Sequence, residues 1–484
     1  MQLTSLVRAA VATAILIASH ASHGQSALKL PDLGTSALQV LPLEKEQAIG
    51  DVMMMQIRSQ SPLVQDPVLD EYLTSLGNKL VANANDVRFP FSFFWINNQA
   101  INAFAFYGGH VGVHTGLIAQ ADNESQLASV LGHEIAHVTQ RHLARRIQQA
   151  KDNNALTLAG MIAGILTTVV APDAGMAILA ANSTQAQLSQ LTHSRKAEQE
   201  ADRFGMQTLY EAGFDPSQAS EFLSKLSAQV RYQTKPPTFL LTHPLPDSRV
   251  SDVRLRAQQF APRYVPTSLK FDLAKSRVLA RYQYKSEDAQ AYFENQLRLK
   301  ATEMSKQALE YGLALALLDQ NKLELAQDLL DKLLKHDENN LFYLDAYTDL
   351  LIAQKKPEQA TKLLQLKYEF RPNNQVLTLN LANAAIEAKQ FDTAEKVLKL
   401  FLLDKPQSTL AKDLLSKVYK EQDNKAAYHE MYASLLAQYG AYIKAADEIQ
   451  RALNHINEQE TVKEARLKAL LSQYRQMQKE LAKL

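Results

Sequence analysis

The sequence predicts a mainly helical α+β protein, in which an N-terminal domain with a small antiparallel sheet is followed by an all-α solenoid of helical repeats. Strand-like runs lie between residues 89 and 117, and amphipathic helical patterns follow them. After about residue 270, small residues recur every 34 positions. With 484 residues, 46% of them hydrophobic, the chain is long enough to form several domains with buried cores.

The composition excludes several classes of protein and site. Lys and Arg total 52 and Asp and Glu total 51, so the formal charge of +1 provides no overall field that would attract nucleic acid or an anionic membrane. The lack of cysteine excludes disulfides, thiolate metal sites, cysteine nucleophiles and a lipidated N-terminal cysteine. Any metal must therefore be bound by histidine, aspartate or glutamate.

Residues 1–24 have the pattern of a secretory signal peptide. Arg8 supplies the positive charge, and the apolar run at 9–18 is too short to span a bilayer. Ser22 and Gly24 place small side chains at the −3 and −1 positions of a cleavage site. We expect an exported protein, with the bacterial periplasm as its compartment. The alternative is an uncleaved anchor helix, which the polar and helix-breaking residues after the apolar run oppose.

The N-terminal domain is predicted over residues 25–265. Its strand-like runs are FPFSFFWIN at 89–97 and AFAFYGGHVGVHTGL at 103–117. Two glycines interrupt the second run, as in a hairpin of two antiparallel strands. Residues 123–265 have mostly helical patterns, so the sheet is expected to be small.

The second domain is predicted over residues 266–484, after a linker marked by Pro262 and Pro266. Its pattern has the 34-residue period of the tetratricopeptide repeat, in which two antiparallel helices form one unit. No single pair of helices can bury its apolar stripe, so the units are expected to stack into a solenoid. We count three regular repeats with irregular ones on either side, and the pattern slips after residue 408. The recurring positions are Ala314, Thr348 and Ala382, then Ala326, Ala360 and Ala394, and finally Pro372 and Pro406.

The sequence HEIAH at residues 133–137 indicates a metal site. On a helix, His133 and His137 lie one turn apart on the same face, so both imidazoles can reach one ion. Glu134 lies outside this row but close enough to contact a water molecule on the metal. The helix itself is well supported, because Asn123 is a suitable N-cap and apolar residues follow it at helical spacing.

A catalytic zinc needs a third protein ligand and one open position. A metzincin would have glycine at 140 and histidine at 143, where this chain has Gln140 and Leu143. The segment LTHSRKAEQEAD offers carboxylates on a second helix instead. Glu198 and Asp202 share one face of that helix, so one is expected to bind the metal while the other orients a histidine or the water. Glu200 is expected to point elsewhere.

Three segments, in order, resemble the zinc metallopeptidases of the HtpX and CAAX prenyl protease type. SRKAEQEAD (194–202) is similar to the SRxxExxAD signature of that family. NAFAFYGGHVGVHTGLI (102–118) resembles the strand-turn segment before its HExxH motif, and THPLPDSR (242–249) resembles its downstream His-Pro…Arg element. The resemblance implies a gluzincin-type metalloprotease domain. With the signal peptide and the repeats, the architecture resembles periplasmic members that act in outer-membrane barrel assembly.

Carried over residue by residue, the resemblance implies one zinc ion per chain, with His133, His137 and Glu198 as its ligands. It implies that Glu134 is the general base, which takes a proton from the attacking water and passes it to the leaving amine. The strand near 103–114 would hold an extended substrate as an added strand, and this mode of binding favours unfolded segments.

Three further residues match the family pattern in less defined roles. Asp202 matches an aspartate with an acid or supporting role, or it only orients one of the ligand histidines. His243 and Arg249 match residues that face the metal, where either would stabilise the oxyanion of the reaction. His243 has two alternatives: it occupies the open zinc position and holds the enzyme inactive, or it is a structural histidine stiffened by Pro244.

The implied function is that of a periplasmic zinc metalloendopeptidase with chaperone-like activity, which promotes assembly or degradation of outer-membrane β-barrel proteins and keeps the outer membrane intact. The implied partners are misfolded or stalled barrel proteins and, through the repeats, the barrel assembly machinery. No nucleic acid and no firm membrane span are expected. The alternative is a repeat scaffold or chaperone with a latent zinc site and little proteolysis. The intact Glu134 argues against a purely structural site, because a closed site needs no base.

Two further features of the sequence support weaker predictions. The apolar segment 155–171 is at the lower length limit for a membrane span and is expected to be a buried helix, or a mobile or membrane-touching cover beside the active site. His142 lies five residues beyond His137 and is expected at the surface, while His110 and His114 are expected to be structural residues of the predicted strand.

Overall fold

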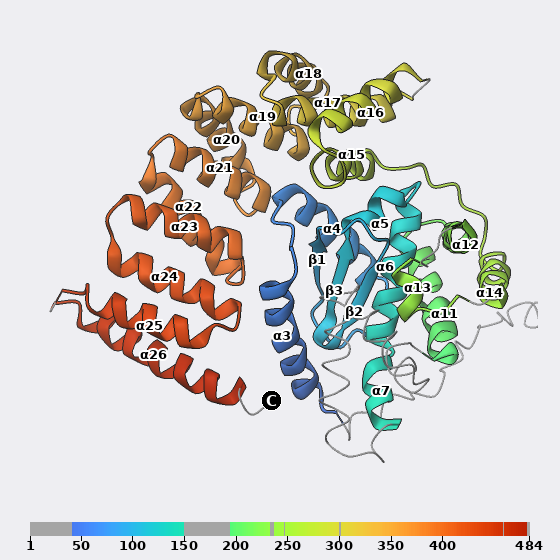
Figure 1. The fold of residues 1–484 in the computed structure, drawn as a ribbon, viewed down its shortest axis with the longest axis horizontal. Coiled ribbons are helices and arrows are strands. Elements are labelled where there is room, and N and C mark those ends of the chain that lie inside the picture. Colours follow the sequence, from blue (N-terminus) through green and yellow to red (C-terminus); the bar gives the residue numbers. More distant parts are fainter. Residues whose placement is uncertain are drawn as a thin grey trace, which may run out of the picture.

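The computed structural model describes residues 41–149, 194–232, 237–245, 247–299, 302–457 and 459–481. Within these ranges the chain is mainly helical and contains one small sheet, which confirms the predicted fold class (Figure 1). The predicted signal peptide at 1–24 and the apolar segment at 155–171 lie outside the described residues. In the described part of the chain, no helix is both long and apolar enough to cross a membrane.

The sheet contains β1 (Ser92–Ile96), β2 (Ala103–Phe106) and β3 (His110–His114), in the order β1-β3-β2. β2 and β3 form the predicted antiparallel hairpin, and Gly108 and Gly109 in its turn have positive φ angles of 77° and 81°. β3 pairs with β1 in parallel, so the prediction of a wholly antiparallel sheet is wrong. The chain reverses once between β1 and β2 and again before β3, and two reversals return it to its first direction.

Helices surround the sheet, with α6 (Glu124–Thr139) at the centre of the domain (Figure 1). This helix contacts β2 and β3 on one side and α4, α11 and α12 on others. The other helices of the domain are α3 (Leu43–Gln60), α4 (Pro67–Val81), α5 (Thr115–Gln120), α7 (His142–Gln149), α11 (Arg195–Glu211), α12 (Ser217–Tyr232), α13 (Phe239–Thr242) and α14 (Asp247–Ala257).

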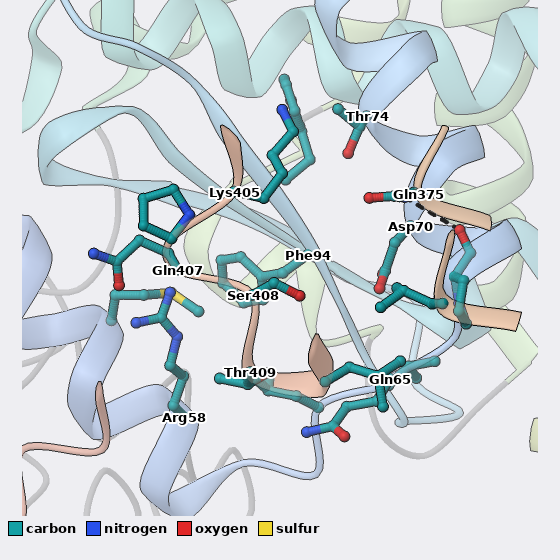
Figure 2. A pocket seen from close by; sticks show the side chains of 18 of the residues that line it. Arg58, Gln65, Asp70, Thr74, Phe94, Gln375, Lys405, Gln407, Ser408 and Thr409 are labelled. Carbon is teal, nitrogen blue, oxygen red and sulfur yellow. Dashed lines mark hydrogen bonds between the residues drawn. The ribbon is translucent and has the colours of Figure 1, made fainter. Parts of the chain in front are cut away.

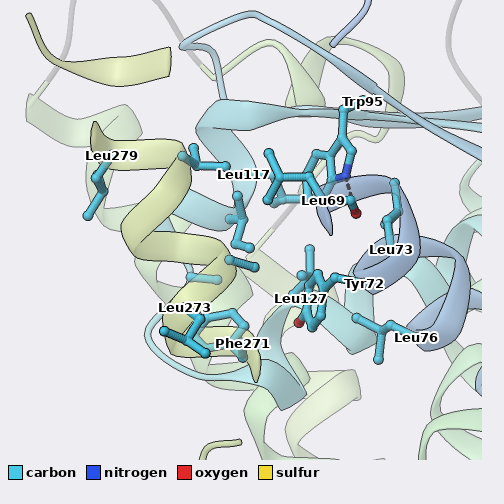
Figure 3. Packing of buried hydrophobic residues seen from close by; sticks show 14 of the residues in the cluster. Leu69, Tyr72, Leu73, Leu76, Trp95, Leu117, Leu127, Phe271, Leu273 and Leu279 are labelled. Atoms are coloured by element: carbon cyan, nitrogen blue, oxygen red, sulfur yellow. Dashed lines mark hydrogen bonds between the residues drawn. The ribbon is translucent and has the colours of Figure 1, made fainter. Parts of the chain in front are cut away.

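The largest hydrophobic core lies between the sheet and the helices next to it (Figure 3). Trp95 of β1 is fully buried there, and its indole N–H donates to the backbone oxygen of Leu69 at 3.0 Å. Phe271 and Leu273 of α15 (Leu269–Val278), the first helix after the predicted linker, are buried in the same cluster. The first helix of the predicted second domain therefore shares a core with the sheet, and the same apolar burial stabilises both.

His114, the last residue of β3, is expected to make the fold sensitive to acid. Its side chain is fully buried, and burial lowers the pKa of its imidazole to about 4. A hydrogen bond with the backbone of Ala100 acts in the opposite direction and raises the pKa in part. The unfolded chain takes up this proton at about pH 6.5 and the folded chain only near pH 4, so stability falls as the pH falls through this window.

The expected loss from His114 is about 3 kcal/mol of unfolding free energy between pH 6.5 and pH 4. His114→Phe keeps a ring of similar size and removes the titrating group. Unfolding by denaturant at pH 7 and pH 4.5 measures the effect in the parent and the variant. Equal acid sensitivity in the two proteins would contradict the assignment.

The rest of the chain forms pairs of antiparallel helices that stack into a solenoid (Figure 1). A short π-helix (Leu279–Gln283) follows α15. The helices after it are α16 (Ser286–Arg298), α17 (Glu303–Asp319), α18 (Leu323–His336), α19 (Leu341–Ala353), α20 (Pro357–Phe370), α21 (Gln375–Glu387), α22 (Phe391–Asp404), α23 (Thr409–Glu421), α24 (Lys425–Gln438), α25 (Tyr442–Leu453) and α26 (Thr461–Leu481).

The 34-residue period is visible in the packing and in the turns of the solenoid. The small residues that recur with this period are fully buried, namely Ala314, Thr348, Ala382, Ala326, Ala360 and Ala394. The α17–α18, α19–α20, α21–α22 and α23–α24 turns each contain a residue with a left-handed backbone, and these residues are also 34 positions apart: Asn321, Lys355, Lys389 and Asp423. Asp423 shows that the period continues one turn beyond the slip at residue 408 that the sequence indicated.

The solenoid curves so that its last helices lie beside α3 of the first domain (Figure 1). The Tyr442 hydroxyl donates to the Met55 sulfur at 3.3 Å across this contact. A cavity of about 710 Å³ lies between the two parts, and Arg58 and Phe94 face Lys405 and Ser408 around it (Figure 2).

Candidate metal centre

Helix α6 places the HEIAH motif inside the protein. The Asn123 side chain caps the helix by accepting from the Gln126 N–H at 3.0 Å. The Gln126 side chain accepts in turn from the Asp122 N–H at 2.9 Å, which holds the chain before the first turn. His133, Glu134 and His137 are all buried in the second half of the helix.

Helix α11 brings Glu198 to the motif. Ser194 caps this helix by accepting from the Ala197 N–H, so Glu198 lies in its first turn. The two helices cross closely at Gly132 and Gly205, where a Cβ on Gly205 would lie 3.0 Å from backbone atoms of α6. A Cβ at this distance would be tighter than an ordinary contact, so the two glycines favour the close crossing, which brings the carboxylate within reach of the imidazoles.

The candidate ligand atoms are separated by distances that suit a metal ion. His133 Nε2 and His137 Nε2 are 3.0 Å apart, and the Glu198 carboxylate lies 3.4 Å from the first and 3.3 Å from the second. A tetrahedral zinc with bonds of about 2.1 Å would separate its ligands by about 3.4 Å. Two nitrogen ligands and one oxygen ligand, all buried, therefore fit a divalent ion such as zinc.

His243 is part of the same cluster. It follows the short helix α13, and its Nδ1 lies 3.3 Å from His133 Nε2 and 3.0 Å from Glu198 Oε1. Its Nε2 lies 3.3 Å from the Glu134 carboxylate. The four side chains of His133, His137, Glu198 and His243 each offer one ligand atom within 4.8 Å of the others.

Asp202 and Arg249 border the cluster on the side of His133. Asp202 Oδ1 lies 3.0 Å from His133 Nδ1, the ring nitrogen that faces away from His137. Arg249 donates to both oxygens of Asp202 at 2.8 Å, and its Nη1 lies 2.5 Å from Glu198. The guanidinium therefore neutralises two buried carboxylates, which without it would repel each other.

The cluster shifts the pKa of each of its carboxylates. Burial raises the pKa of Glu134, the direction that suits a general base. Burial acts to raise the pKa of Glu198 and Asp202 too, but other interactions outweigh it. The electrostatic interaction with His243 and hydrogen bonds with the surrounding imidazoles hold the pKa of Glu198 well below its usual range, and Arg249 lowers the pKa of Asp202. A low pKa favours the ionised form of Glu198, the form that could bind a metal.

β2 lies at the edge of the sheet, next to the motif. The backbone N–H of Ala105 donates to the Glu134 carboxylate, so this strand is within reach of the reacting groups. The structure thus places an edge strand, the HEIAH helix and the Glu198 helix around one site.

One residue of the site differs from the sequence prediction. The sequence predicts His142 at the surface, but it is buried and its Nδ1 lies 2.8 Å from His137 Nδ1. Glu200 lies outside the group of candidate ligands, and its carboxylate lies 3.2 Å from the Nε2 of that same His142. The prediction assumed that the helix continues past His137, whereas α6 ends at Thr139 and α7 begins a new axis. No glycine or proline marks this break, so the sequence contains no local signal for it.

Comparisons with known proteins agree with this arrangement. Residues 67–257 match the model of peptidase family M48, and residues 351–418 match a tetratricopeptide repeat model. The chain is 43% identical over 393 residues to the beta-barrel assembly-enhancing protease of Yersinia pestis, and this alignment covers 81% of each chain. It is 38% identical over 462 residues to the protein of that name in Escherichia coli strain K12, and this alignment covers 94% of this chain and 93% of the other.

Proposed function

The chain belongs to the family of the beta-barrel assembly-enhancing proteases, which makes it a metalloendopeptidase of peptidase family M48, and we propose on this basis that it is a periplasmic zinc enzyme. We propose His133, His137 and Glu198 as the ligands of one zinc ion. The observation that supports this most directly is the convergence of two imidazoles and a remote carboxylate at separations of 3.0, 3.3 and 3.4 Å.

The proposed chemistry assigns Glu134 the role of general base. A bound zinc ion lowers the pKa of water and polarises the peptide carbonyl. Glu134, whose pKa is raised by burial, accepts the proton of the attacking water and passes it to the leaving amine. The edge of β2 holds the substrate in an extended form by pairing with it as one more strand.

Three residues receive supporting roles in the proposal. Asp202 orients the His133 ring by contacting the Nδ1 atom of that histidine. The Asp202 carboxylate is held in turn by hydrogen bonds from Nε and Nη2 of Arg249. Arg249 balances the charge of Glu198 and Asp202. His243 is close enough to the other ligand atoms to be a fourth ligand, in which case it must move before substrate can bind.

The proposed substrates are unfolded or stalled outer-membrane β-barrel proteins, and the proposed partner of the repeats is the barrel assembly machinery. Support comes from the names of the two relatives and from the solenoid that follows the peptidase domain. Chaperone-like activity would use the same solenoid. The second candidate, a repeat scaffold with a latent zinc site, is opposed by the buried Glu134 beside the ligands.

Removal of the metal tests the proposal. A strong chelator should abolish cleavage of an unfolded barrel protein by the full chain, and Zn²⁺ should restore it, because the reaction requires the metal. Glu198→Gln should lose both bound metal and activity, whereas Glu211→Gln, the same change at the other end of α11, should keep both. Metal content is measured by mass spectrometry, and a metal-free protein that Zn²⁺ leaves inactive would contradict the proposal.

A further inference from the structure

The two histidines of the HEIAH motif differ in what their outward nitrogens contact. His133 Nδ1 faces the carboxylate of Asp202 at 3.0 Å. His137 Nδ1 faces a second imidazole, with His142 Nδ1 at 2.8 Å. A metal-binding imidazole takes its tautomer and its orientation from the group at the other ring nitrogen. The residue at His137 Nδ1 therefore matters for metal binding.

The turn between α6 and α7 is built to hold His142 in this place. Arg141 has a left-handed backbone with φ of 52°, which ends α6 and redirects the chain. Its buried guanidinium donates to Glu46 at 2.7 and 3.1 Å and to the backbone oxygen of Leu41 at 2.7 Å. This strained residue is thus fixed by α3 and the chain before it, and His142 begins the next helix with its ring against His137.

The far side of His142 is fixed as well. Its Nε2 lies 3.2 Å from Glu200 Oε2, and Arg145 donates to the same oxygen at 2.6 Å. His142 itself is 5% exposed, so water competes little for these contacts. The ring therefore has a defined partner at each nitrogen.

The donors and acceptors match in one arrangement of protons. If His137 binds the metal through Nε2, its Nδ1 carries the hydrogen and donates to His142 Nδ1. His142 must then carry its own hydrogen on Nε2, which donates to Glu200. Arg145 balances the charge of that carboxylate. Both imidazoles stay neutral, as a metal ligand and its partner require.

We propose that His142 is a positioning residue of the metal centre: it accepts the Nδ1 hydrogen of His137 and, anchored by Glu200 and Arg145, holds the His137 ring for metal binding through Nε2. This inference rests on the proposed ligand set. It assigns a role to a histidine and a glutamate that the motif and the helical spacing do not indicate.

Zinc binding by the full chain tests this role without any need for cleavage. All variants carry Glu134→Gln to prevent self-digestion, and competition with a chelator gives the Kd for Zn²⁺. His142→Leu should raise that Kd by about 10- to 100-fold, the effect usual for a residue that orients a ligand. Glu200→Gln should raise it less, because His142 keeps its contact with His137.

Rescue separates positioning from a general effect on structure. His142→Asn places an amide oxygen near the former Nδ1 and should recover most of the affinity that His142→Leu loses. The absorption spectrum of the Co²⁺-loaded protein should change in His142→Leu and return toward the parent in His142→Asn. His429→Leu is the matched control, since His429 contacts a carboxylate at 2.6 Å in the solenoid, and its Kd should equal that of the parent.

Two results would overturn the role of His142 alone: a Kd of His142→Leu within twofold of the parent, or a His142→Asn variant that binds no better than His142→Leu. A parent protein that binds no Zn²⁺ would overturn the proposed ligand set and this inference together. The unfolding temperature of the metal-free variants shows whether a weaker Kd reflects loss of the fold.

Discussion

Glu134→Gln is expected to lower the rate of peptide cleavage by about a hundredfold to ten-thousandfold, which is the usual contribution of a positioned general base. Glutamine has almost the same shape as glutamate but cannot take the proton of the attacking water. Glu134 is fully buried beside the ligands, so bulk water cannot easily replace it. The variant should keep its metal, since Glu134 is not one of the proposed ligands.

Initial rates on an unfolded barrel protein, measured beside metal content, check this expectation. Glu124→Gln is the matched control, because Glu124 lies in the first turn of the same helix and accepts from the Tyr72 hydroxyl at 3.1 Å. Cleavage by Glu134→Gln at the parental rate would show that another group is the base.

The same variant separates the two candidate functions. An inactive Glu134→Gln protein that still restores an envelope defect in a deletion strain would favour the scaffold or chaperone function. Failure to restore it, with the metal and the fold intact, would favour the peptidase. The two functions can also share the chain, and partial restoration would then be expected.

Arg277→Leu is expected to destabilise the fold by about 3–5 kcal/mol, the usual cost of breaking a buried ion pair. Arg277 is buried where the first solenoid helices meet α4, and its guanidinium lies 2.6 Å from Asp66 and 2.7 Å from Asp345. It also donates to the Tyr311 hydroxyl at 2.9 Å. Leucine would leave two buried carboxylates without a cation.

Unfolding by urea measures this loss. Arg281→Leu is the matched control, because its ion pairs with Asp319 and Asp349 lie at 3.3 and 3.0 Å and it is partly exposed. The control should therefore lose less stability. Adding Asp345→Asn to Arg277→Leu should recover part of the loss, because one uncompensated carboxylate is removed. Equal unfolding midpoints for Arg277→Leu and the parent would contradict the role assigned to this cluster.

Much of the architecture could be predicted from periodicity. The 34-residue spacing predicted the solenoid because each unit repeats the same packing, and Ala326, Ala360 and Ala394 are buried at that spacing. The hairpin of β2 and β3 was predicted from an alternating run with two glycines. The parallel pairing of β3 with β1 was not predicted, because strand order depends on contacts between segments that are distant in the sequence.

The site, too, combines features that local sequence predicts with features that depend on the packing of distant segments. The positions of His133 and His137 relative to each other follow from helical geometry, since residues four apart share a face. The distance from either histidine to Glu198 depends on how α6 and α11 cross at Gly132 and Gly205, and no local pattern encodes that crossing. His243 joins the cluster from a third segment for the same reason.

By itself, the sequence determined the features that arise within one element or one repeat: the HEIAH face of a helix, its N-cap, the hairpin and the solenoid. Only the tertiary structure decided which carboxylates meet the histidines and that His142 turns back to His137. Side chains one turn apart are positioned by the geometry of their own helix, which local sequence encodes. Contacts between helices depend on the packing of the whole core, which becomes defined only when the chain is folded.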